Sequence, residues 1–278
     1  MDPIRDRVIL LTGAGGGLGR AIAQRLAARG ARLALAGRHP EPLAALGSEL
    51  DTPTVAISAD ITDAASRKHL LERVQTELGA VDVLINNAGL EEITDFPSQD
   101  PELIRRIFET NTLGPVLLTR ELLPEMLRRG RGDVVNIASL AGRTGMPFGA
   151  VYAGSKGALA EWSLSLYGEL AGSGVRVSLV APGFVADAGM FARKGVDAPR
   201  AMRACRPADV AGAVLRALAG DRPEQVVTPG PARLLMALRA IAPRLAMRVA
   251  ARLGLVTFLA GLAAMRPGPS DRHRPDER

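Results

Sequence analysis

Tyr152 and Lys156 have the residue types and the spacing to carry out acid–base chemistry. They lie four positions apart, so on a helix they share one face, one turn along the axis. Both types are scarce, because the chain has two tyrosines and three lysines beside many arginines. A phenol with a pKa of ~10 is a weak acid at neutral pH, and we expect the ammonium to stabilise the phenolate and lower that pKa. An isolated Tyr-x-x-x-Lys is more often an ordinary surface pair, so the rest of the chain decides between the two interpretations.

A glycine-rich loop follows the first aliphatic run of the chain. It reads Thr12-Gly13-Ala14-Gly15-Gly16-Gly17-Leu18-Gly19 and has the spacing Gly-x-x-x-Gly-x-Gly. Missing side chains let the backbone turn tightly, and the start of the next helix offers N–H groups and positive potential to a pyrophosphate. A glycine loop alone is weak evidence, but its position between a strand and a helix predicts nucleotide binding.

The chain alternates short aliphatic runs with longer helical ones. The predicted strands are 7–12, 32–36, 55–58, 81–86, 133–139, 175–181 and 225–228. The predicted helices are 18–29, 42–50, 62–78, 101–110, 111–129, 151–171 and 207–218, with Asp60 and Thr62 in position to cap the third. Strands and helices in this order are typical of a parallel sheet covered on both faces. We therefore predict an α/β protein: a Rossmann-type doubly wound parallel sheet, forming a single domain with a helical C-terminal extension.

Length and composition agree with one large domain. With 278 residues, 47% of them hydrophobic and 3% aromatic, the chain can bury a sizeable aliphatic core. The net charge of +6 is compatible with nucleic acid, but no basic stripe is interleaved with aromatic residues, so we expect no nucleic-acid partner. The single Cys205 excludes an internal disulfide, and the charged N-terminus fits no secretory signal. We expect a cytoplasmic protein.

Further motifs occur in order along the chain. They are the loop at 12–19, Asp60 after the third strand, Asn86-Asn87-Ala88-Gly89 after the fourth, Asn111 in a helix, Ser139 ending the fifth strand, Tyr152 with Lys156, and Pro182-Gly183 after the sixth strand. With these motifs the chain resembles a classical short-chain dehydrogenase/reductase from Thr12 to about Gly183. The resemblance implies an NAD(P)-dependent enzyme that acts on CH–OH or C=O groups.

The resemblance also implies a role for each motif residue. Ser139 would orient a substrate carbonyl, and Tyr152 would donate the proton in reduction and accept it in oxidation. Lys156 would lower the pKa of the tyrosine and hold nicotinamide-ribose hydroxyls. Asn111 would position a water in the proton relay, although an asparagine satisfied by backbone groups inside a helix is the alternative. The expected cofactor-binding residues, in a site without metal, are Thr12, Gly13, Gly17, Leu18, Gly19, Arg38, Asp60, Ile61, Asn87, Ala88, Gly89, Tyr152, Lys156, Pro182, Gly183 and Val185.

The end of the second strand predicts which nicotinamide cofactor is used. Members of the family that prefer NAD resemble one another in an acidic residue there, which accepts hydrogen bonds from the adenosine ribose. Here that position is Gly37, and the adjacent Arg38 can pair with a 2′-phosphate. We therefore expect NADP(H), although Gly16 stands where some NADP-preferring members carry a basic residue.

The chain departs from the family pattern after Gly183. The resemblance leads us to expect a threonine four residues later, but Asp187 occupies that position and leaves the cofactor contacts beyond Val185 open. The loop 184–206 mixes apolar residues with arginines, as expected of a substrate-side lid or of an ordinary surface loop. An apolar substrate would suit such a lid.

Three classes of function are compatible with this pattern. The first is an oxidoreductase that transfers a hydride between NADP(H) and a carbonyl or alcohol carbon, with Tyr152 as general acid and base. The second is a non-catalytic nucleotide-binding sensor or scaffold, which would not need Asn111, Ser139, Tyr152 and Lys156 together. The third, an epimerase or dehydratase of the extended branch, fits less well because little chain follows Thr228. Relatives often pair through the helices around 111–129 and 151–171, so we expect a homodimer.

The chain divides into three parts: 1–230, the NADP-binding and catalytic domain; 231–265, a basic amphipathic helical extension; and 266–278, a disordered tail. In the extension one apolar stripe recurs at spacings of three and four: Leu234, Leu238, Ile241, Leu245, Val249 and Leu253. Arg244, Arg248 and Arg252 follow beside it, and we expect a bend at Pro243. The extension would lie on a membrane surface, or else its stripe would pack on its own domain or on a second subunit.

Overall fold

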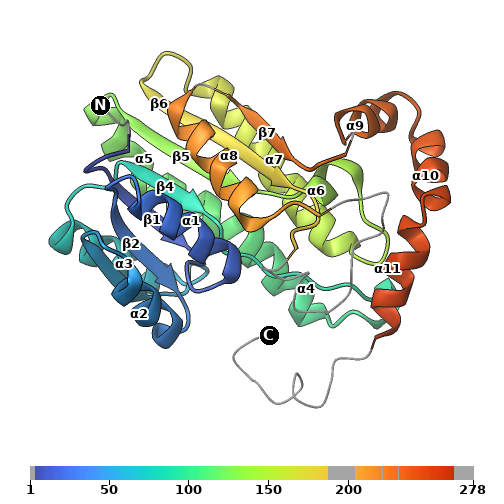
Figure 1. The fold of residues 1–278 in the computed structure, drawn as a ribbon, viewed down its shortest axis with the longest axis horizontal. Coiled ribbons are helices and arrows are strands. Elements are labelled where there is room, and N and C mark those ends of the chain that lie inside the picture. The colour runs from blue at the N-terminus through green and yellow to red at the C-terminus, as the bar shows by residue number, and fades with distance from the viewer. Residues whose placement is uncertain (1–3, 187–203, 221, 231, 266–278) are drawn as a thin grey trace.

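The described residues form a parallel sheet of seven strands in the order β3-β2-β1-β4-β5-β6-β7 (Figure 1). The computed structural model describes residues 4–186, 204–220, 222–230 and 232–265. The strands are β1 (Val8–Thr12), β2 (Arg32–Gly37), β3 (Thr54–Ser58), β4 (Val83–Asn86), β5 (Gly132–Ile137), β6 (Val175–Pro182) and β7 (Glu224–Val227). The order reverses between β1 and β4, which leaves a crevice at the carboxyl ends of the strands. The predicted doubly wound Rossmann-type sheet is confirmed.

Helices cover both faces of this sheet. They include α1 (Gly17–Ala27), α2 (Pro40–Glu49), α3 (Ala64–Glu77), α4 (Pro101–Phe108), α5 (Gly114–Arg129), α6 (Leu140–Thr144), α7 (Ala150–Glu169) and α8 (Pro207–Ala219). Successive strand residues point to opposite faces. Ile9 and Leu11 therefore join the core beneath α1, α2 and α8, whereas Val8 and Leu10 join the core beneath α3, α5 and α7.

Three segments differ from the predicted elements. A π-helical turn, η2 (Glu109–Leu113), joins α4 to α5, where two separate helices were predicted. The short helix α6, which follows Ser139, was not predicted. The third helix begins at Ala64 because Asp63, not Asp60 or Thr62, caps it by accepting a 2.7 Å hydrogen bond from the Ser66 amide.

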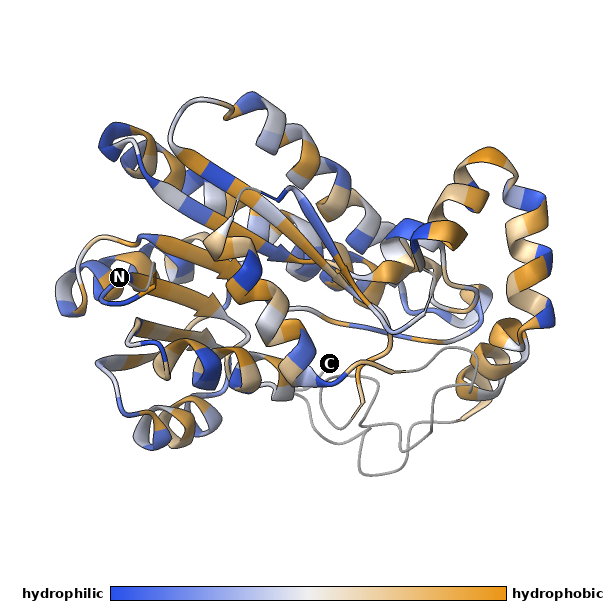
Figure 2. Cartoon of the chain, turned by 45° about the horizontal axis from the view of Figure 1, so that its top comes forward, coloured by the Kyte–Doolittle hydropathy of each residue, from blue (hydrophilic) through white to orange (hydrophobic). Residues whose placement is uncertain are grey.

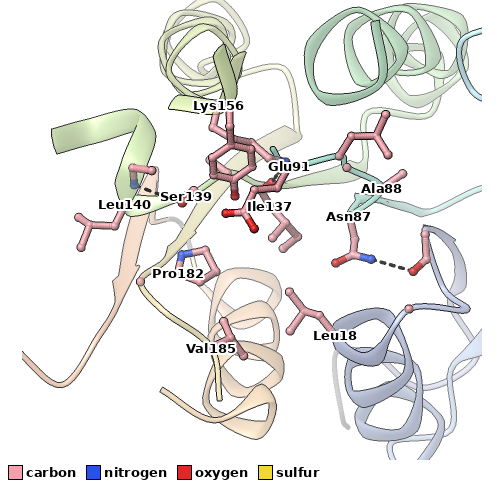
Figure 3. Close-up of a pocket in the computed structure, with 18 of the residues that line it drawn as sticks. Leu18, Asn87, Ala88, Glu91, Ile137, Ser139, Leu140, Lys156, Pro182 and Val185 are labelled. Carbon is pink, nitrogen blue, oxygen red and sulfur yellow. Dashed lines mark hydrogen bonds between the residues drawn. The ribbon is translucent and has the colours of Figure 1, made fainter. Parts of the chain in front are cut away.

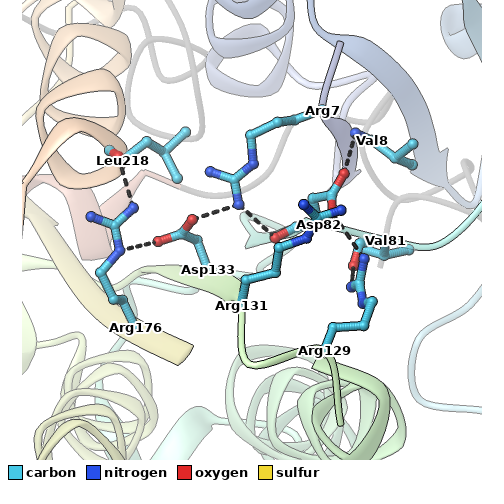
Figure 4. Close-up of polar contacts among 9 residues, drawn as sticks. All are labelled: Arg7, Val8, Val81, Asp82, Arg129, Arg131, Asp133, Arg176 and Leu218. Atoms are coloured by element: carbon cyan, nitrogen blue, oxygen red, sulfur yellow. Dashed lines mark hydrogen bonds and ion pairs between the residues drawn. The ribbon is translucent and has the colours of Figure 1, made fainter. Parts of the chain in front are cut away.

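Ion pairs join the amino ends of four strands, at the edge of the sheet away from the crevice (Figure 4). Asp133 accepts from Arg7 at 2.6 Å and from Arg176 at 2.7 Å. Asp82 accepts from the Val8 amide at 3.1 Å and from Arg129 at 2.9 Å. Since Asp133 is 5% exposed, these contacts form a buried clamp across β1, β5 and β6.

Three more helices, here called the arm, follow the sheet: α9 (Ala232–Ile241), α10 (Pro243–Arg252) and α11 (Leu255–Ala264). The chain bends before Pro243 as predicted. A second break at Gly254, whose φ is 82°, sets α10 and α11 at 68° to each other. Figure 1 shows the arm standing beyond the carboxyl ends of the strands. The predicted disordered tail, 266–278, lies outside the described residues.

The arm is attached to the rest of the protein at both of its ends. Arg239 of α9 donates a 2.7 Å hydrogen bond to the Arg143 carbonyl in α6. At the other end, Leu259 and Leu262 of α11 are buried in one cluster with Tyr152 and Met146. The rings of Phe258 and Phe184 meet edge to face at 5.9 Å. The predicted domain boundary at residue 230 therefore separates two segments that pack against each other.

Candidate active site

A pocket of about 1120 Å³ runs along the carboxyl ends of the strands and reaches the arm. It is lined by every residue predicted to bind a cofactor and, of the four predicted catalytic residues, by Ser139, Tyr152 and Lys156. Figure 3 shows how residues from separate elements converge there. Leu18 comes from α1, Asn87 and Ala88 follow β4, Lys156 comes from α7, and Pro182 ends β6.

The glycine loop between β1 and α1 forms one end of the pocket. Gly13 has a φ of 65°, and a Cβ there would lie 2.8 Å from the Cα of Ala88. A Cβ on Gly19 would lie 2.2 Å from the Gly13 carbonyl oxygen. The N-cap of α1, Gly16, makes no side-chain capping bond, and the first turn holds no acidic residue. Backbone N–H groups at Gly17, Leu18 and Gly19 can therefore receive an anion, and the cradle fits a dinucleotide pyrophosphate.

Thr12 and Asn87 hold the glycine loop against the end of β4. The Thr12 hydroxyl accepts hydrogen bonds from the amides of Asn87 and Ala88 at 3.0 and 3.1 Å. The Asn87 side-chain amide donates to the carbonyl oxygens of Thr12 and Gly13, both at 3.0 Å. Both polar side chains are thus engaged inside the protein, and they shape the groove rather than extend into it.

Asn111 lies behind the pocket, fully buried in the π-helical turn. Its side-chain amide donates to the Leu90 carbonyl at 2.8 Å and to the Ser155 hydroxyl at 2.9 Å, and its oxygen accepts from the Leu90 amide at 2.7 Å. A Cβ on Gly89 would lie 3.2 Å from that oxygen and 3.3 Å from Lys156 Nζ. The side chain of Asn111 therefore fixes the loop after β4 and sits close behind Lys156.

Tyr152, Ser139 and Lys156 form the polar centre of the pocket. The Ser139 hydroxyl accepts from the Ala141 amide at 3.2 Å and lines the pocket together with Tyr152. Lys156 donates to the Ile137 carbonyl at 2.9 Å. Tyr152 and Lys156 share a face of α7, while Ser139 stands where β5 leads into α6. The predicted trio is therefore brought together by two adjacent elements.

Burial governs the acid–base properties of this centre. It raises the pKa of Tyr152 well above its ordinary value; the charge of Glu91 raises it further, and the Ser139 hydrogen bond lowers it only in part. The expected fall in the tyrosine pKa is therefore not found. Burial lowers the pKa of Lys156 to about 8, against the opposing effect of Glu91. At neutral pH the phenol keeps its proton.

Glu91 is a site residue that the sequence analysis missed. It follows the Asn-Asn-Ala-Gly motif by two positions, and Figure 3 shows it in the pocket that Ser139 and Lys156 also line. An acidic residue just after a strand-end motif was the available signal. The arm residues that line the pocket were also missed in that role: Leu234, Leu235, Leu238, Val249, Leu253 and Leu255. Four of them, Leu234, Leu238, Val249 and Leu253, belong to the apolar stripe predicted from the sequence, which did not show where that stripe packs.

The other end of the pocket is built by the ends of β2 and β3. Arg38 is exposed at the rim, directly after Gly37. The Asp60 carboxylate accepts from the Thr62 amide and hydroxyl at 2.9 and 2.7 Å. The buried Arg67 supports the next residue by donating to the Ile61 carbonyl at 2.9 Å, and it pairs with Glu121. Both Asp60 and Ile61 line the pocket.

The chain after β6 closes the pocket on its remaining side. Gly183 donates from its amide to the Val227 carbonyl at 2.9 Å. Val185 and Cys205 form an isolated parallel bridge, with backbone bonds from Ala186 to Cys205 and from Cys205 to Phe184. The predicted loop 184–206 therefore starts and ends at one point. Asp187, where a threonine was expected, lies outside the described residues.

Comparison with known proteins gives consistent matches. A profile of the short chain dehydrogenase family matches residues 7–198. Ketoacyl reductase HetN of Nostoc sp. is 36% identical over 266 residues, 93% of each protein. Dehydrogenase/reductase SDR family member 7B of Bos taurus is 34% identical over 267 residues, 89% of this chain and 81% of that protein.

Solved structures match over most of this chain as well. A metagenomic short-chain oxidoreductase in complex with NADP has a TM-score of 0.70 and 32% identity, covering 82% of this chain and 99% of that one. A short-chain dehydrogenase from Streptomyces avermitilis has a TM-score of 0.76 and 30% identity, covering 89% of this chain and 97% of that one.

Proposed function

This chain belongs to the short-chain dehydrogenase/reductase family, and from that premise we propose that it is an NADP(H)-dependent oxidoreductase. It acts on the carbonyl or alcohol carbon of an apolar substrate, with Tyr152 as general acid and base. The observation that carries this proposal is that Tyr152, Ser139 and Lys156 line the same pocket as the glycine loop. A nicotinamide bound in this pocket supplies or accepts the hydride.

In the reductive direction, the side chains of the polar centre move a proton to the substrate oxygen. Ser139 orients the carbonyl, and Tyr152 donates its phenolic proton to the oxygen. The raised pKa of Tyr152 keeps this proton on the phenol at neutral pH, so the proton is available for transfer. Lys156 has three donors, one of which the Ile137 carbonyl accepts, so others remain for sugar hydroxyls.

The choice of NADP(H) is supported by the end of β2. No carboxylate stands at Gly37, and Arg38 lies at the rim of the pocket with its cation in solvent. A guanidinium there can form charge-assisted hydrogen bonds with a 2′-phosphate. The metagenomic relative was solved in complex with NADP.

An apolar substrate is supported by the lining of the pocket beyond Tyr152. Leu235, Leu238 and Leu255 of the arm face the space next to the polar centre, and Met146 packs in the cluster that contains Tyr152. Aliphatic walls on this side of the pocket suit a hydrocarbon chain. A ketone on an acyl chain is the substrate class we favour, since the Nostoc relative is named a ketoacyl reductase.

The first prediction tests Tyr152 against the second tyrosine of the chain. Tyr152→Phe removes the proton donor but keeps the ring, so NADPH-dependent turnover of a ketone panel should fall by roughly 10²–10⁴-fold. NADPH binding, measured by fluorescence titration, should stay within about threefold of wild type. Tyr167→Phe on the same helix is the matched control and should keep turnover. Wild-type turnover by Tyr152→Phe would favour a nucleotide-binding sensor instead.

The second prediction concerns cofactor choice. Arg38→Ala removes a charge-assisted contact worth roughly 1.5–3 kcal/mol, so the Kd for NADPH should rise by roughly 10–150-fold while that for NADH changes little. Arg5→Ala, remote from the pocket, should change neither value. Equal losses for the two cofactors would show that Arg38 does not contact the 2′-phosphate.

A further inference from the structure

The outward side of the arm carries positive charge that no described residue neutralises. Residues 232–265 include five arginines and no aspartate or glutamate. Arg244, Arg248 and Arg252 are exposed, and at 100° per residue they share one face of α10. Among the described parts of the chain, none of these three forms an ion pair. Within the part of the chain that the structure describes, this face is therefore a basic surface without an acidic counterpart.

Large apolar side chains border that basic face. Ile241 is 85% exposed, Leu245 48% and Met247 45%, with Leu245 and Met247 on opposite sides of the arginine row. Figure 2 shows hydrophilic and hydrophobic residues alternating along the arm. Exposed Leu, Ile and Met beside arginines are the composition of a helix that lies in a lipid headgroup layer.

The same surface is continuous with the pocket. Leu234, which is 69% exposed, and Leu253, which is 45% exposed, both line it. Between them Leu238 and Val249 extend the apolar wall inward toward Leu255. An apolar path thus runs from the exposed side of α9 and α10 to the cluster that contains Tyr152.

We propose that α9 and α10 dock on an anionic lipid surface, so that the apolar mouth of the pocket opens toward lipid. Charge selects this occupant over a second copy of the chain, because two identical arginine rows would repel each other across a twofold interface. Among the described helices, none is long and apolar enough to cross a membrane alone. The bent pair α10 and α11 together has the length and composition of a membrane span. Leu259 and Leu262 are buried in the cluster that contains Tyr152 and Met146, so α11 stays packed on the protein while α10 lies on the lipid surface.

The docking also specifies how substrate reaches Tyr152, and this part rests on the proposed function. A carbonyl compound with a long hydrocarbon chain partitions into lipid and enters the pocket between α9 and α10 without crossing water. Reduction of such a substrate should therefore respond to vesicles, whereas reduction of a short, water-soluble ketone should not.

Vesicle co-sedimentation of the full-length protein tests the docking without any turnover. The probes are phosphatidylcholine vesicles with and without 30% phosphatidylglycerol. We expect binding to the anionic vesicles and release by salt. Each arginine near the anionic lipid surface should raise the binding constant roughly fivefold. Arg244→Gln with Arg248→Gln should therefore weaken vesicle binding by roughly 25-fold. Ile241→Ser with Leu245→Ser should also weaken binding to the anionic vesicles at low salt, because these side chains contribute apolar contact with the lipid rather than charge.

A matched control replaces two exposed arginines elsewhere, Arg105→Gln with Arg131→Gln, and should bind like wild type. All variants should keep wild-type NADPH binding and melting temperature. The docking proposal is wrong if the protein stays in the supernatant at low salt, if both vesicle types bind equally, or if Ile241→Ser with Leu245→Ser converts an oligomer to monomers without changing vesicle binding. If anionic vesicles bind the protein but no ketone is reduced, the docking stands and the proposed enzymatic function fails.

Discussion

At the residue scale, the unusual component of the site is the carboxylate of Glu91. It lines the pocket with Tyr152 and Lys156 and raises the pKa of both. For the tyrosine the effect adds to burial and keeps the acid protonated. For the lysine it opposes burial and keeps the ammonium charged at neutral pH. One negative charge thus maintains the proton on both groups.

The third prediction follows from the sign of that effect. Because the pKa of Lys156 is about 8, kcat/KM should fall as the pH rises through that value and the ammonium is lost. Glu91→Gln removes the charge that raises this pKa, so the alkaline limb should move to lower pH. Glu102→Gln, exposed on α4, is the control and should leave the limb in place. A limb that stays in place in Glu91→Gln, or moves to higher pH, contradicts the assignment.

At the element scale, the site depends on how closely α6 approaches α7. A Cβ on Gly142 would lie 2.6 Å from the Gly157 amide nitrogen and 2.6 Å from the Lys156 carbonyl carbon. The two backbones therefore touch directly beside the lysine. Since Ser139 caps α6 and Tyr152 lies on α7, this contact sets the distance between the two hydroxyl groups.

The fourth prediction is that Gly142→Ala separates these helices. Displacement of a positioned group by a fraction of an ångström is costly, so turnover should fall roughly tenfold or more while NADPH affinity is kept. Gly168→Ala, at a position on α7 where a Cβ meets nothing within 4 Å, should keep full activity and gain a little helix stability. Loss of turnover in both variants, or in neither, would contradict this explanation.

The elements also show what could be predicted from the sequence. The alternation of aliphatic runs with helical ones and the glycine loop were sufficient for the sheet, because strands buried on both faces and separated by helices are typical of a parallel α/β sheet. The Tyr152–Lys156 spacing brought the right pair together. Pairings distant in sequence had no local signal: the approach of α6 to α7, the burial of Leu259 near Tyr152, and the position of Glu91 all depend on tertiary packing. For the same reason the pKa of Tyr152 was predicted in the wrong direction.

At the scale of the whole molecule, stability and chemistry occupy opposite edges of the sheet. The Asp133 clamp ties β1, β5 and β6 at their amino ends, while the pocket lies at the carboxyl ends. Loops around the pocket can therefore vary without loosening the strands. The exposed side of α7 presents a row of mostly small residues beside the exposed Phe108 and Leu113: Gly154, Ala158, Glu161 and Ser165.

The fifth prediction is that this row forms the interface of a homodimer, which we propose on the basis of its small residues and of Phe108, 37% exposed and next to Gly154. Light scattering should give about twice the monomer mass of 29.2 kDa. Ala158→Arg should yield monomers, since a long charged side chain cannot be packed there, while Ala44→Arg on α2 should leave the dimer intact. A wild-type monomer at micromolar concentration would contradict the proposal.

The bridge between Val185 and Cys205 makes the chain suitable for a chemical measurement of local opening. Cys205 is the single thiol, it is 3% exposed, and burial raises its pKa to about 11. Thiol reagents can therefore label it only when the backbone around the end of β6 parts. The labelling rate therefore reports how often the backbone around Cys205 opens. Slower labelling after addition of NADPH would show that a bound cofactor stabilises the bridge between Val185 and Cys205, and the measurement needs no engineered probe.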